Sequence, residues 1–200
     1  RQSNSYVNKL KWRLGLKLCI TQPGTGKGAG IALFYDENVE VIKLAVGPRY
    51  IDVLIRLSSN GIQWRGTFVY GEPKAHERHN MWNLLRRIKP NSSAPWMMIG
   101  DFNETMWQSE HISVAKRSER NMENFRKVLS ECNLMDLGYK GPIWTYNNKQ
   151  DGRSNVRARL DRGVATPSWS EHFKYATVEH ICSSCSDHLP ILLRLGRRKE

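Results

Sequence analysis

The sequence contains no run of about 18 apolar residues, and its first residues are polar. These two absences predict that the chain has neither a transmembrane helix nor a signal peptide. Cysteine is also scarce, with four residues at Cys19, Cys132, Cys182 and Cys185. Because four scattered cysteines are too few for a disulfide framework, we expect free thiols and a reducing, intracellular compartment.

Acidic residues are the third shortage. The chain has 19 Asp and Glu against 31 Lys and Arg, which gives a formal net charge of +12 and a sequence pI near 9.8. A surplus of positive charge of this size favours polyanionic partners, which are nucleic acids first and anionic membranes second. We therefore expect a nucleic-acid partner and no membrane association.

Two segments resemble ligand-binding motifs but lack a required part. Residues 22–30 contain four glycines, yet they lack the Gly-Lys-Ser/Thr ending of a nucleotide-binding loop, and a strand rather than a helix is expected to follow. Cys182 and Cys185 form a C-x-x-C pair without a second Cys or His pair at zinc spacing and without a following helix pattern. We interpret the first as a turn between strands and the second as plain thiols.

Length and hydrophobic pattern predict one globular domain over residues 1–196, followed by a basic tail at 197–200. Strand patterns occur at both ends of the chain, with two amphipathic helix patterns between them. The fold class that follows is α+β, a layered α/β sandwich of two packed, mainly antiparallel sheets flanked by helices. The expected helices cover residues 76–88 and about 122–129, with a helical turn at 167–173 and a short helix before the strand at 17–21. The other expected strands cover residues 31–35, 39–46, 50–57, 63–70, 96–103, 132–137, 141–146, 156–164, 173–181 and 190–195.

The stretch from Trp96 to Asn103 is the most informative of these strands. A short apolar run leads to Gly100 and then to Asp101 and Asn103, which are two residues apart. In an extended segment alternate side chains share a face, so Asp101 and Asn103 would point into one pocket and Phe102 into the core. The alternative is a strand that ends in an Asx-type turn.

Other polar residues also occur where strands are expected to end. They are Tyr70, Asp161, Asp187 and His188. Residues far apart in sequence that all lie at strand ends are what a pocket at one edge of a sandwich requires. An Asp and an Asn can orient a water molecule, a His held by an Asp can stay protonated, and carboxylate oxygens suit magnesium.

Three short motifs that contain these residues together resemble motifs of the endonuclease/exonuclease/phosphatase superfamily. They are Gly-Asp-Phe-Asn at 100–103, Arg-Leu-Asp-Arg at 159–162 and Ser-Asp-His-Leu-Pro at 186–190. Within that superfamily, Val-Tyr-Gly-Glu-Pro at 69–73, Trp-Asn-Leu-Leu at 82–85 and Gly-Pro-Ile-Trp-Thr-Tyr at 141–146 resemble the endonuclease domain of plant LINE-type (non-LTR) retrotransposons. The resemblance covers nearly the whole chain.

The resemblance implies a role for each site residue. Asp101 would activate the attacking water, and Asn103 would hold the water or the phosphate. His188 would contact the non-bridging oxygens of the scissile phosphate, and Asp161 would orient its imidazole. Asp187 would bind the metal, Mg²⁺ or alternatively Mn²⁺, and Tyr70 would contact the phosphate or the leaving group.

The sequence also departs from the family pattern. The family has a first strand that ends in an Asn and a second strand that ends in a metal-binding Glu, and both would precede the region aligned to Gln2. We therefore expect a fold without its first strands and a metal site short of one carboxylate, which would lower or abolish activity.

The function implied is a magnesium-dependent endonuclease of a retrotransposon that nicks one strand of duplex DNA, with the nucleus as its compartment. The nick would prime reverse transcription by a domain absent from this chain. Two alternatives stay open at this stage. One is a non-catalytic remnant that binds nucleic acid, and the other is a relative that acts on small phosphoesters. The sequence indicates neither the preferred DNA sequence nor the oligomeric state.

Overall fold

The computed structural model describes residues 4–24, 30–57, 61–90 and 94–196. Part of the predicted glycine turn at 22–30 and the whole predicted basic tail at 197–200 lie outside these residues. The chain divides into two compact units, residues 1–70 and 71–200, and each is described in turn. The single domain over residues 1–196 stays a prediction.

The first unit contains a helix, a hairpin and an antiparallel meander, as predicted. Strand β1 pairs with β2, and β3, β4 and β5 pair in sequence order, with a register shift between Lys43 and Ala45. Apolar residues on alternate positions of β4, namely Ile51, Val53 and Ile55, are buried, as expected for an extended segment with one face in the core. The elements of this unit are α1 (Asn4–Arg13), β1 (Leu18–Gln22), β2 (Ile31–Tyr35), β3 (Val39–Gly47), β4 (Tyr50–Leu57) and β5 (Gln63–Tyr70).

The second unit contains the remaining helices and three small sheets. The sheets have the strand orders β6-β11-β8, β12-β13 and β7-β10-β9, and every strand pair in them is antiparallel. The helical elements are η1 (Ala75–Glu77), α2 (Arg78–Ile88), η2 (Gln108–Glu110), α3 (Glu119–Glu131), η3 (Gly152–Ser154) and α4 (Pro167–His172). The strands are β6 (Trp96–Asp101), β7 (His111–Ile112), β8 (Met135–Asp136), β9 (Tyr146–Asn147), β10 (Arg157–Ala158), β11 (Asp161–Ala165), β12 (Thr177–His180) and β13 (Ile191–Arg194).

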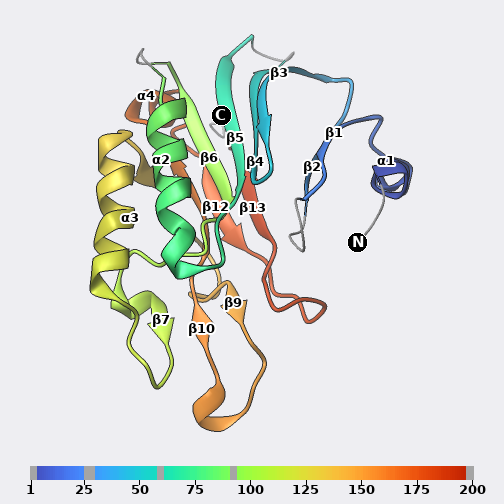
Figure 1. Ribbon diagram of the computed structural model, residues 1–200. Helices are drawn as coiled ribbons and strands as arrows, with labels where there is room; N and C mark the ends of the chain where they lie inside the picture. Colours follow the sequence, from blue (N-terminus) through green and yellow to red (C-terminus); the bar gives the residue numbers. More distant parts are fainter. Residues whose placement is uncertain (1–3, 25–29, 58–60, 91–93, 197–200) are drawn as a thin grey trace. The chain divides into compact units, whose positions relative to one another are not determined.

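These elements form three layers within the second unit (Figure 1). Helices α2 and α3 pack together through the stacked rings of Trp82 and Phe125, and Phe125 also contacts Phe102 at the end of β6. On the other face of the sheet, a Cβ added to Gly163 in β11 would lie 3.0 Å from a methyl group of Val178 in β12. Since this distance is shorter than an ordinary van der Waals contact, the two sheets approach closely at Gly163, and the layered sandwich is confirmed.

The amphipathic pattern of α3 shows how the sequence specifies this packing. The four apolar residues that predicted the helix, Met122, Phe125, Val128 and Leu129, are all buried in the structure. They recur at helical spacing, so they form one apolar stripe that covers the sheet. The prediction of this helix from periodicity is therefore confirmed.

Several strand predictions are wrong in extent: the strands expected at 132–137 and 173–181 are reduced to β8 and β12, and two others differ as follows. Residues 156–164 form two strands in two sheets, because the chain bends at Arg159 and Leu160 between β10 and β11. The bend is held by other partners: the Arg159 N–H donates to the Glu110 carbonyl at 3.0 Å, and the Leu160 N–H donates to the Thr145 hydroxyl at 3.0 Å. The strand expected at 141–146 is reduced to β9, and strand β7 was not predicted.

All four cysteines are free, and Cys182 and Cys185 are exposed. In the described part of the chain, no helix combines the length and the hydrophobicity that crossing a membrane requires.

Candidate active site

The register between two antiparallel strands places two carboxylates next to each other. Asp101 ends β6, Asp161 begins β11, and the two residues are direct partners in the pair. Residues directly opposite each other in such a pair have side chains on the same face. Both are buried, with exposed fractions of 9% and 8%. The structure thus brings together two of the predicted site residues.

Asn103 joins this pair by a turn, and the extended arrangement expected over residues 101–103 is wrong. Asn103 has a φ of 55°, in the left-handed region, so the chain leaves the strand there. Its backbone N–H donates to Asp101 Oδ1 at 2.7 Å, and its Nδ2 donates to Asp101 Oδ2 at 2.8 Å. The Asx-type turn named above as the alternative is therefore formed, and the same turn brings the amide onto the carboxylate. Phe102 is fully buried, as expected.

His188 reaches the site from the loop between β12 and β13. Its Nδ1 donates to Asp161 Oδ2 at 2.8 Å, and the side chain is 30% exposed. Because the Nδ1–H is held by the carboxylate, the ring is fixed in orientation and its other nitrogen is left for a ligand. The structure thus forms the Asp–His pair that the sequence predicted.

The protonation of the site follows from burial and charge. Burial raises the pKa of Asp101 to about 7, the negative charge of Asp161 adds to the rise, and the charge of His188 opposes it. Burial disfavours a protonated His188, yet the hydrogen bond and charge of Asp161, with further contributions from Asp101 and Asp187, outweigh it and raise the pKa of the imidazole. The imidazole of His188 therefore keeps its proton to a higher pH than a free imidazole would, beside a carboxyl group of Asp101 that is close to its point of ionisation at neutral pH.

Two supporting residues were not identified as such from the sequence. The Thr145 hydroxyl accepts hydrogen bonds from the backbone N–H groups of Leu160 and Asp161, both at 3.0 Å. The Tyr146 ring lies 5.0 Å from the His188 ring. Both residues had been predicted as strand residues only, since nothing in the local pattern shows that this strand passes beside Asp161.

A divalent cation fits the residues present. Ligand atoms of Asp101, Asp161 and His188 lie within 4.8 Å of one another. Burial, and after it the negative charge of Asp161, disfavour the ionised form of Asp101 and raise its pKa, and a cation beside the two carboxylates would offset both effects. Carboxylate oxygens are also the ligands that Mg²⁺ prefers.

The structure does not place Asp187, the predicted metal ligand, in this three-residue group. Its side chain is exposed, and its Oδ1 accepts a hydrogen bond from the Ser186 hydroxyl at 3.2 Å. Its backbone carbonyl accepts from the Asn147 N–H at 2.9 Å, which ties this loop to β9. Its role as a metal ligand stays a prediction.

Tyr70, the remaining predicted site residue, belongs to the first unit. It ends β5, is half-buried, and its backbone N–H donates to the Arg49 carbonyl at 2.8 Å. The guanidinium of Arg49 lies 5.5 Å from the centre of the Tyr70 ring. Its contact with the phosphate or the leaving group stays a prediction.

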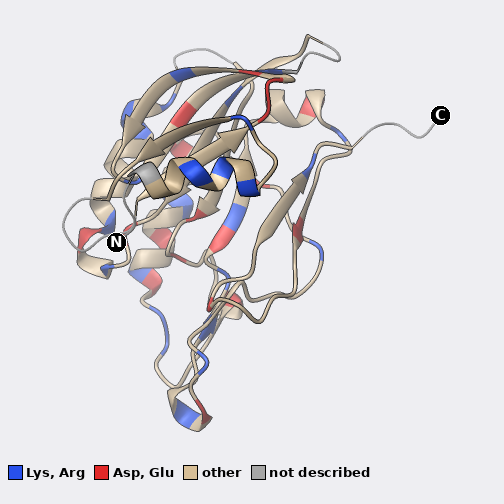
Figure 2. Ribbon diagram, turned by 90° about the vertical axis from the view of Figure 1, so that its right-hand side faces the viewer, with Lys and Arg blue, Asp and Glu red and all other residues tan. Residues whose placement is uncertain are grey.

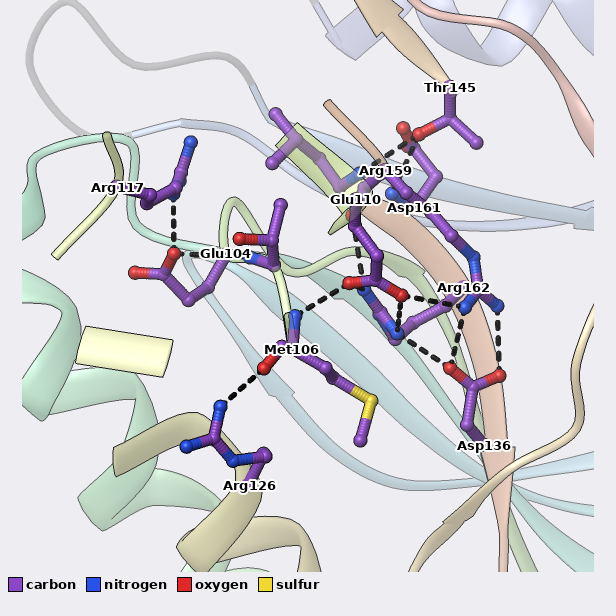
Figure 3. A network of polar contacts seen from close by, with 12 residues as sticks. Glu104, Met106, Glu110, Arg117, Arg126, Asp136, Thr145, Arg159, Asp161 and Arg162 are labelled. Atoms are coloured by element: carbon purple, nitrogen blue, oxygen red, sulfur yellow. Dashed lines mark hydrogen bonds and ion pairs between the residues drawn. The ribbon is translucent and has the colours of Figure 1, made fainter. Parts of the chain in front are cut away.

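Two buried ion-pair clusters lie in the second unit, as the candidate active site does, and neither was found from the sequence (Figure 3). Glu104 pairs with Arg78 and Arg117, and we name these three residues the Glu104 cluster. Charged residues in loops are usually solvated, so the sequence offered only the recurrence of acidic residues after Asp101 as a signal. The second set, named the Glu110 cluster, consists of Glu110, Asp136, Arg159 and Arg162.

Chemically, the site combines a base, a cationic hydrogen-bond donor and a place for a metal. A carboxyl group with a pKa near 7 can accept a proton from water, and an imidazolium can stabilise negative charge on an oxygen. This combination suits hydrolysis of a phosphoester.

Comparison with solved structures shows the same fold at low sequence identity. The endonuclease domain of TRAS1, a telomere-specific non-LTR retrotransposon, is 18% identical with a TM-score of 0.67, and the match covers 90% of this chain and 81% of that one. TDP2 of D. rerio in complex with a single-stranded DNA product is 15% identical over 95% and 81% of the two chains, with a TM-score of 0.55. The mannosyl-6-phosphatase Bt3783 of Bacteroides thetaiotaomicron is 14% identical over 95% and 80%, with a TM-score of 0.55.

No curated protein matches the chain. A family model does, and it covers most of the sequence. Because residues 3–188 match the model of the endonuclease/exonuclease/phosphatase family, the chain belongs to that family, whose members are metal-dependent hydrolases.

Proposed function

We propose that this chain is a DNA-nicking endonuclease of a LINE-type retrotransposon and that it cleaves phosphodiester bonds. The observation that carries the proposal is the 2.8 Å hydrogen bond between Asp161 and His188, formed beside the Asp101–Asn103 pair. A phosphodiester concentrates negative charge on its oxygens during hydrolysis, and these residues supply a protonated donor and a base at one place.

In the proposed reaction each residue has one task. Asp101 accepts the proton of the attacking water while the Asn103 amide orients it. His188, kept protonated by Asp161, donates to a non-bridging oxygen of the phosphate. The carboxylates of Asp101 and Asp161, with Asp187 as a further ligand, would hold a divalent cation, which would neutralise charge on the phosphate; we propose Mg²⁺, or Mn²⁺ in its place.

DNA is the partner that the charge of the chain favours. The net charge of +12 favours binding to a phosphate backbone, because each contact by Lys or Arg releases a counterion. Within the second unit, the arm formed by β9, η3 and β10 carries exposed Lys149, Arg153 and Arg157. Figure 2 shows Lys and Arg along this arm at the bottom of the view. The similarity in fold to the endonuclease domain of a retrotransposon supports a nucleic-acid substrate, and we propose duplex DNA as that substrate and the nucleus as the compartment.

A nicking assay on supercoiled plasmid tests the proposal. Wild-type protein with Mg²⁺ or Mn²⁺ should produce open-circular DNA, and EDTA should stop the reaction. His188→Ala should lower the rate by about 100- to 1,000-fold, because it removes one donor to the transition state. His172→Ala is the matched control, since His172 is exposed and belongs to α4.

Three results would contradict the proposal. Equal nicking by His188→Ala and wild type would place the reaction elsewhere. Plasmid binding without nicking in any metal would favour a non-catalytic DNA-binding protein. Hydrolysis of p-nitrophenyl phosphate without nicking would favour the small-phosphoester alternative, an activity of the kind named for the Bacteroides thetaiotaomicron phosphatase that shares the fold.

A further inference from the structure

Glu104 is the most deeply buried carboxylate next to the candidate active site. It follows Asn103 directly, and its side chain is fully buried. Its Oε2 accepts from Arg78 Nη1 at 2.6 Å, and its Oε1 accepts from Arg117 Nε at 2.6 Å. A carboxylate that is removed from water is tolerated where such partners satisfy it, so Glu104 holds both guanidinium groups in place.

Arg117 passes this constraint to the Asn103 backbone. Its Nη2 donates to the Asn103 carbonyl at 2.7 Å, while its Nε is held by Glu104. Asn103 has a φ of 55°, a conformation that costs free energy for a residue with a side chain. The fork of Arg117 therefore fixes the peptide group that follows this turn.

Arg78 holds the segment that contains the hydrogen-bond acceptor of the Asn103 side-chain amide. Its Nε donates to the Glu72 carbonyl at 3.1 Å, and its Nη2 donates to the Pro73 carbonyl at 2.9 Å. The adjacent Gly71 carbonyl accepts from Asn103 Nδ2 at 3.1 Å. A Cβ on Gly71 would lie 2.4 Å from the Phe102 carbonyl, so this segment packs directly against the turn.

We propose that Glu104 is a positioning residue that sets the orientation of the Asn103 amide. Through Arg117 it fixes the backbone of Asn103, and through Arg78 it fixes the segment that follows Gly71, whose carbonyl shares the amide with Asp101. The catalytic consequence rests on the proposed function, whereas the orientation of the amide does not. A buried ion pair with a purely structural role would stabilise the fold and leave Asn103 unchanged.

Glu110 provides the matched control. It is also buried, and it also pairs with two arginines, Arg159 and Arg162. Its carboxylate holds no group bonded to Asn103 among the described residues. Glu104→Gln and Glu110→Gln therefore remove the same charge from similar surroundings, and only the first should affect the amide.

A double-mutant cycle on nicking separates the two roles. Glu104→Gln should lower kcat by about 10- to 100-fold with little change in KM, as loss of a group that orients a site residue typically does. In an Asn103→Ala background the same change should have almost no further effect on kcat. Glu110→Gln should instead act independently of Asn103→Ala. Equal, additive effects of both glutamate variants would overturn the proposal.

The side-chain amide signals of Asn103 in a ¹⁵N-correlated NMR spectrum give a readout without activity. Asn103→Ala identifies them by their loss, and Glu104→Gln should shift them while Glu110→Gln leaves them in place. If wild type does not nick DNA, the proposed function fails, but this experiment still decides the inference. Unshifted amide signals in folded Glu104→Gln protein would refute it.

Arg117→Lys covers the case in which Glu104→Gln does not fold. Lysine keeps the positive charge but lacks the planar fork, so it cannot reach Glu104 and the Asn103 carbonyl as arginine does. Shifted Asn103 amide signals in this variant are expected. Signals identical to those of wild type would overturn the role of the Glu104 cluster.

Discussion

The Glu104 and Glu110 clusters have the same pairing of glutamate with arginine but two different roles. Each has a buried glutamate between two arginines, and the Met106 backbone lies between them, its N–H donating to Glu110 Oε2 at 2.7 Å. In the Glu104 cluster the free ends of the arginines bind backbone carbonyls beside Asn103. In the Glu110 cluster they bind a second carboxylate, Asp136 in β8.

The difference shows that the groups bound by the remaining donors of the arginines determine what a buried ion pair contributes. The two acids and two bases of the Glu110 cluster balance one another in charge and join the ends of β8 and β11 to η2, which directly precedes β7. The Glu104 cluster has one acid for two bases, so its remaining donors are directed at the backbone. We infer that the first cluster mainly stabilises the sheet and the second mainly orients the site.

Arg162→Met should produce the largest loss of stability. Arg162 is fully buried, and its guanidinium pairs with Glu110 at 2.8 Å and with Asp136 at 2.6 Å. Its removal leaves two buried carboxylates short of a partner, which typically costs about 3–5 kcal/mol. Urea denaturation measures the free energy of unfolding. The control Arg194→Met removes a pair with Glu179 that is 60% exposed at the arginine and should cost under about 1 kcal/mol.

Asp101→Asn should instead increase the free energy of unfolding. Asp101 is a buried carboxylate whose hydrogen bonds come from Asn103 rather than from an arginine, and burial raises its pKa to about 7. A folded-state pKa above the unfolded value of about 3.9 means that the ionised side chain destabilises the fold at high pH. This penalty is fully present above pH 7 and is relieved as the pH falls and the carboxyl group becomes protonated.

We therefore expect Asp101→Asn, measured in EDTA, to be more stable than wild type at pH 8, by about 1–3 kcal/mol, and to nick DNA poorly. The gain should shrink between pH 7 and pH 5, as wild type takes up the proton. Urea midpoints for both proteins at pH 8, 7 and 5 measure it. A stability difference that does not change with pH would show that Asp101 titrates normally.

The Glu110 cluster should make the fold sensitive to acid. Burial alone would raise the pKa of Glu110 and of Asp136, but the charges and hydrogen bonds of Arg162 and Arg159 outweigh it and lower both. Carboxylates with lowered pKa values contribute stability that is present above their unfolded values of about 4 and is lost as the pH falls through the folded ones. At pH values below 4, the urea concentration at the unfolding midpoint should therefore decrease for wild type. It should decrease less for Arg162→Met, where that partner is gone. Parallel pH curves would contradict this.

Sequence patterns predicted the parts of this molecule that depend on local periodicity. The apolar stripe of α3 and the hairpin of β3 and β4 follow from alternation and turn residues, which act over a few positions. The three motifs in their fixed order predicted the pairing of Asp161 with His188, and the structure forms this hydrogen bond. These features could be predicted because each is encoded in one short segment or in a known set of segments.

The remaining features depend on partners that are distant in sequence. The bend at Arg159 exists because Glu110 and Thr145 supply the acceptors there, and no pattern within residues 156–164 indicates them. The left-handed turn at Asn103 is held by Arg117, which the sequence places only in a basic connection. Long-range hydrogen bonds of buried charges therefore mark the limit of what the sequence alone could predict.

An exposed ion pair should show the smallest effect and define the baseline for the two clusters. Arg86 in α2 pairs with Glu131 at the end of α3 at 2.6 Å, with side chains 41% and 38% exposed. Because water solvates both groups, Glu131→Gln should lower the free energy of unfolding by less than about 0.5–1 kcal/mol and leave nicking unchanged. Urea denaturation of Glu131→Gln and Arg162→Met under the same conditions measures the difference in their free energies of unfolding. A cost for Glu131→Gln as large as that of Arg162→Met would mean that burial is not what distinguishes the Glu110 cluster.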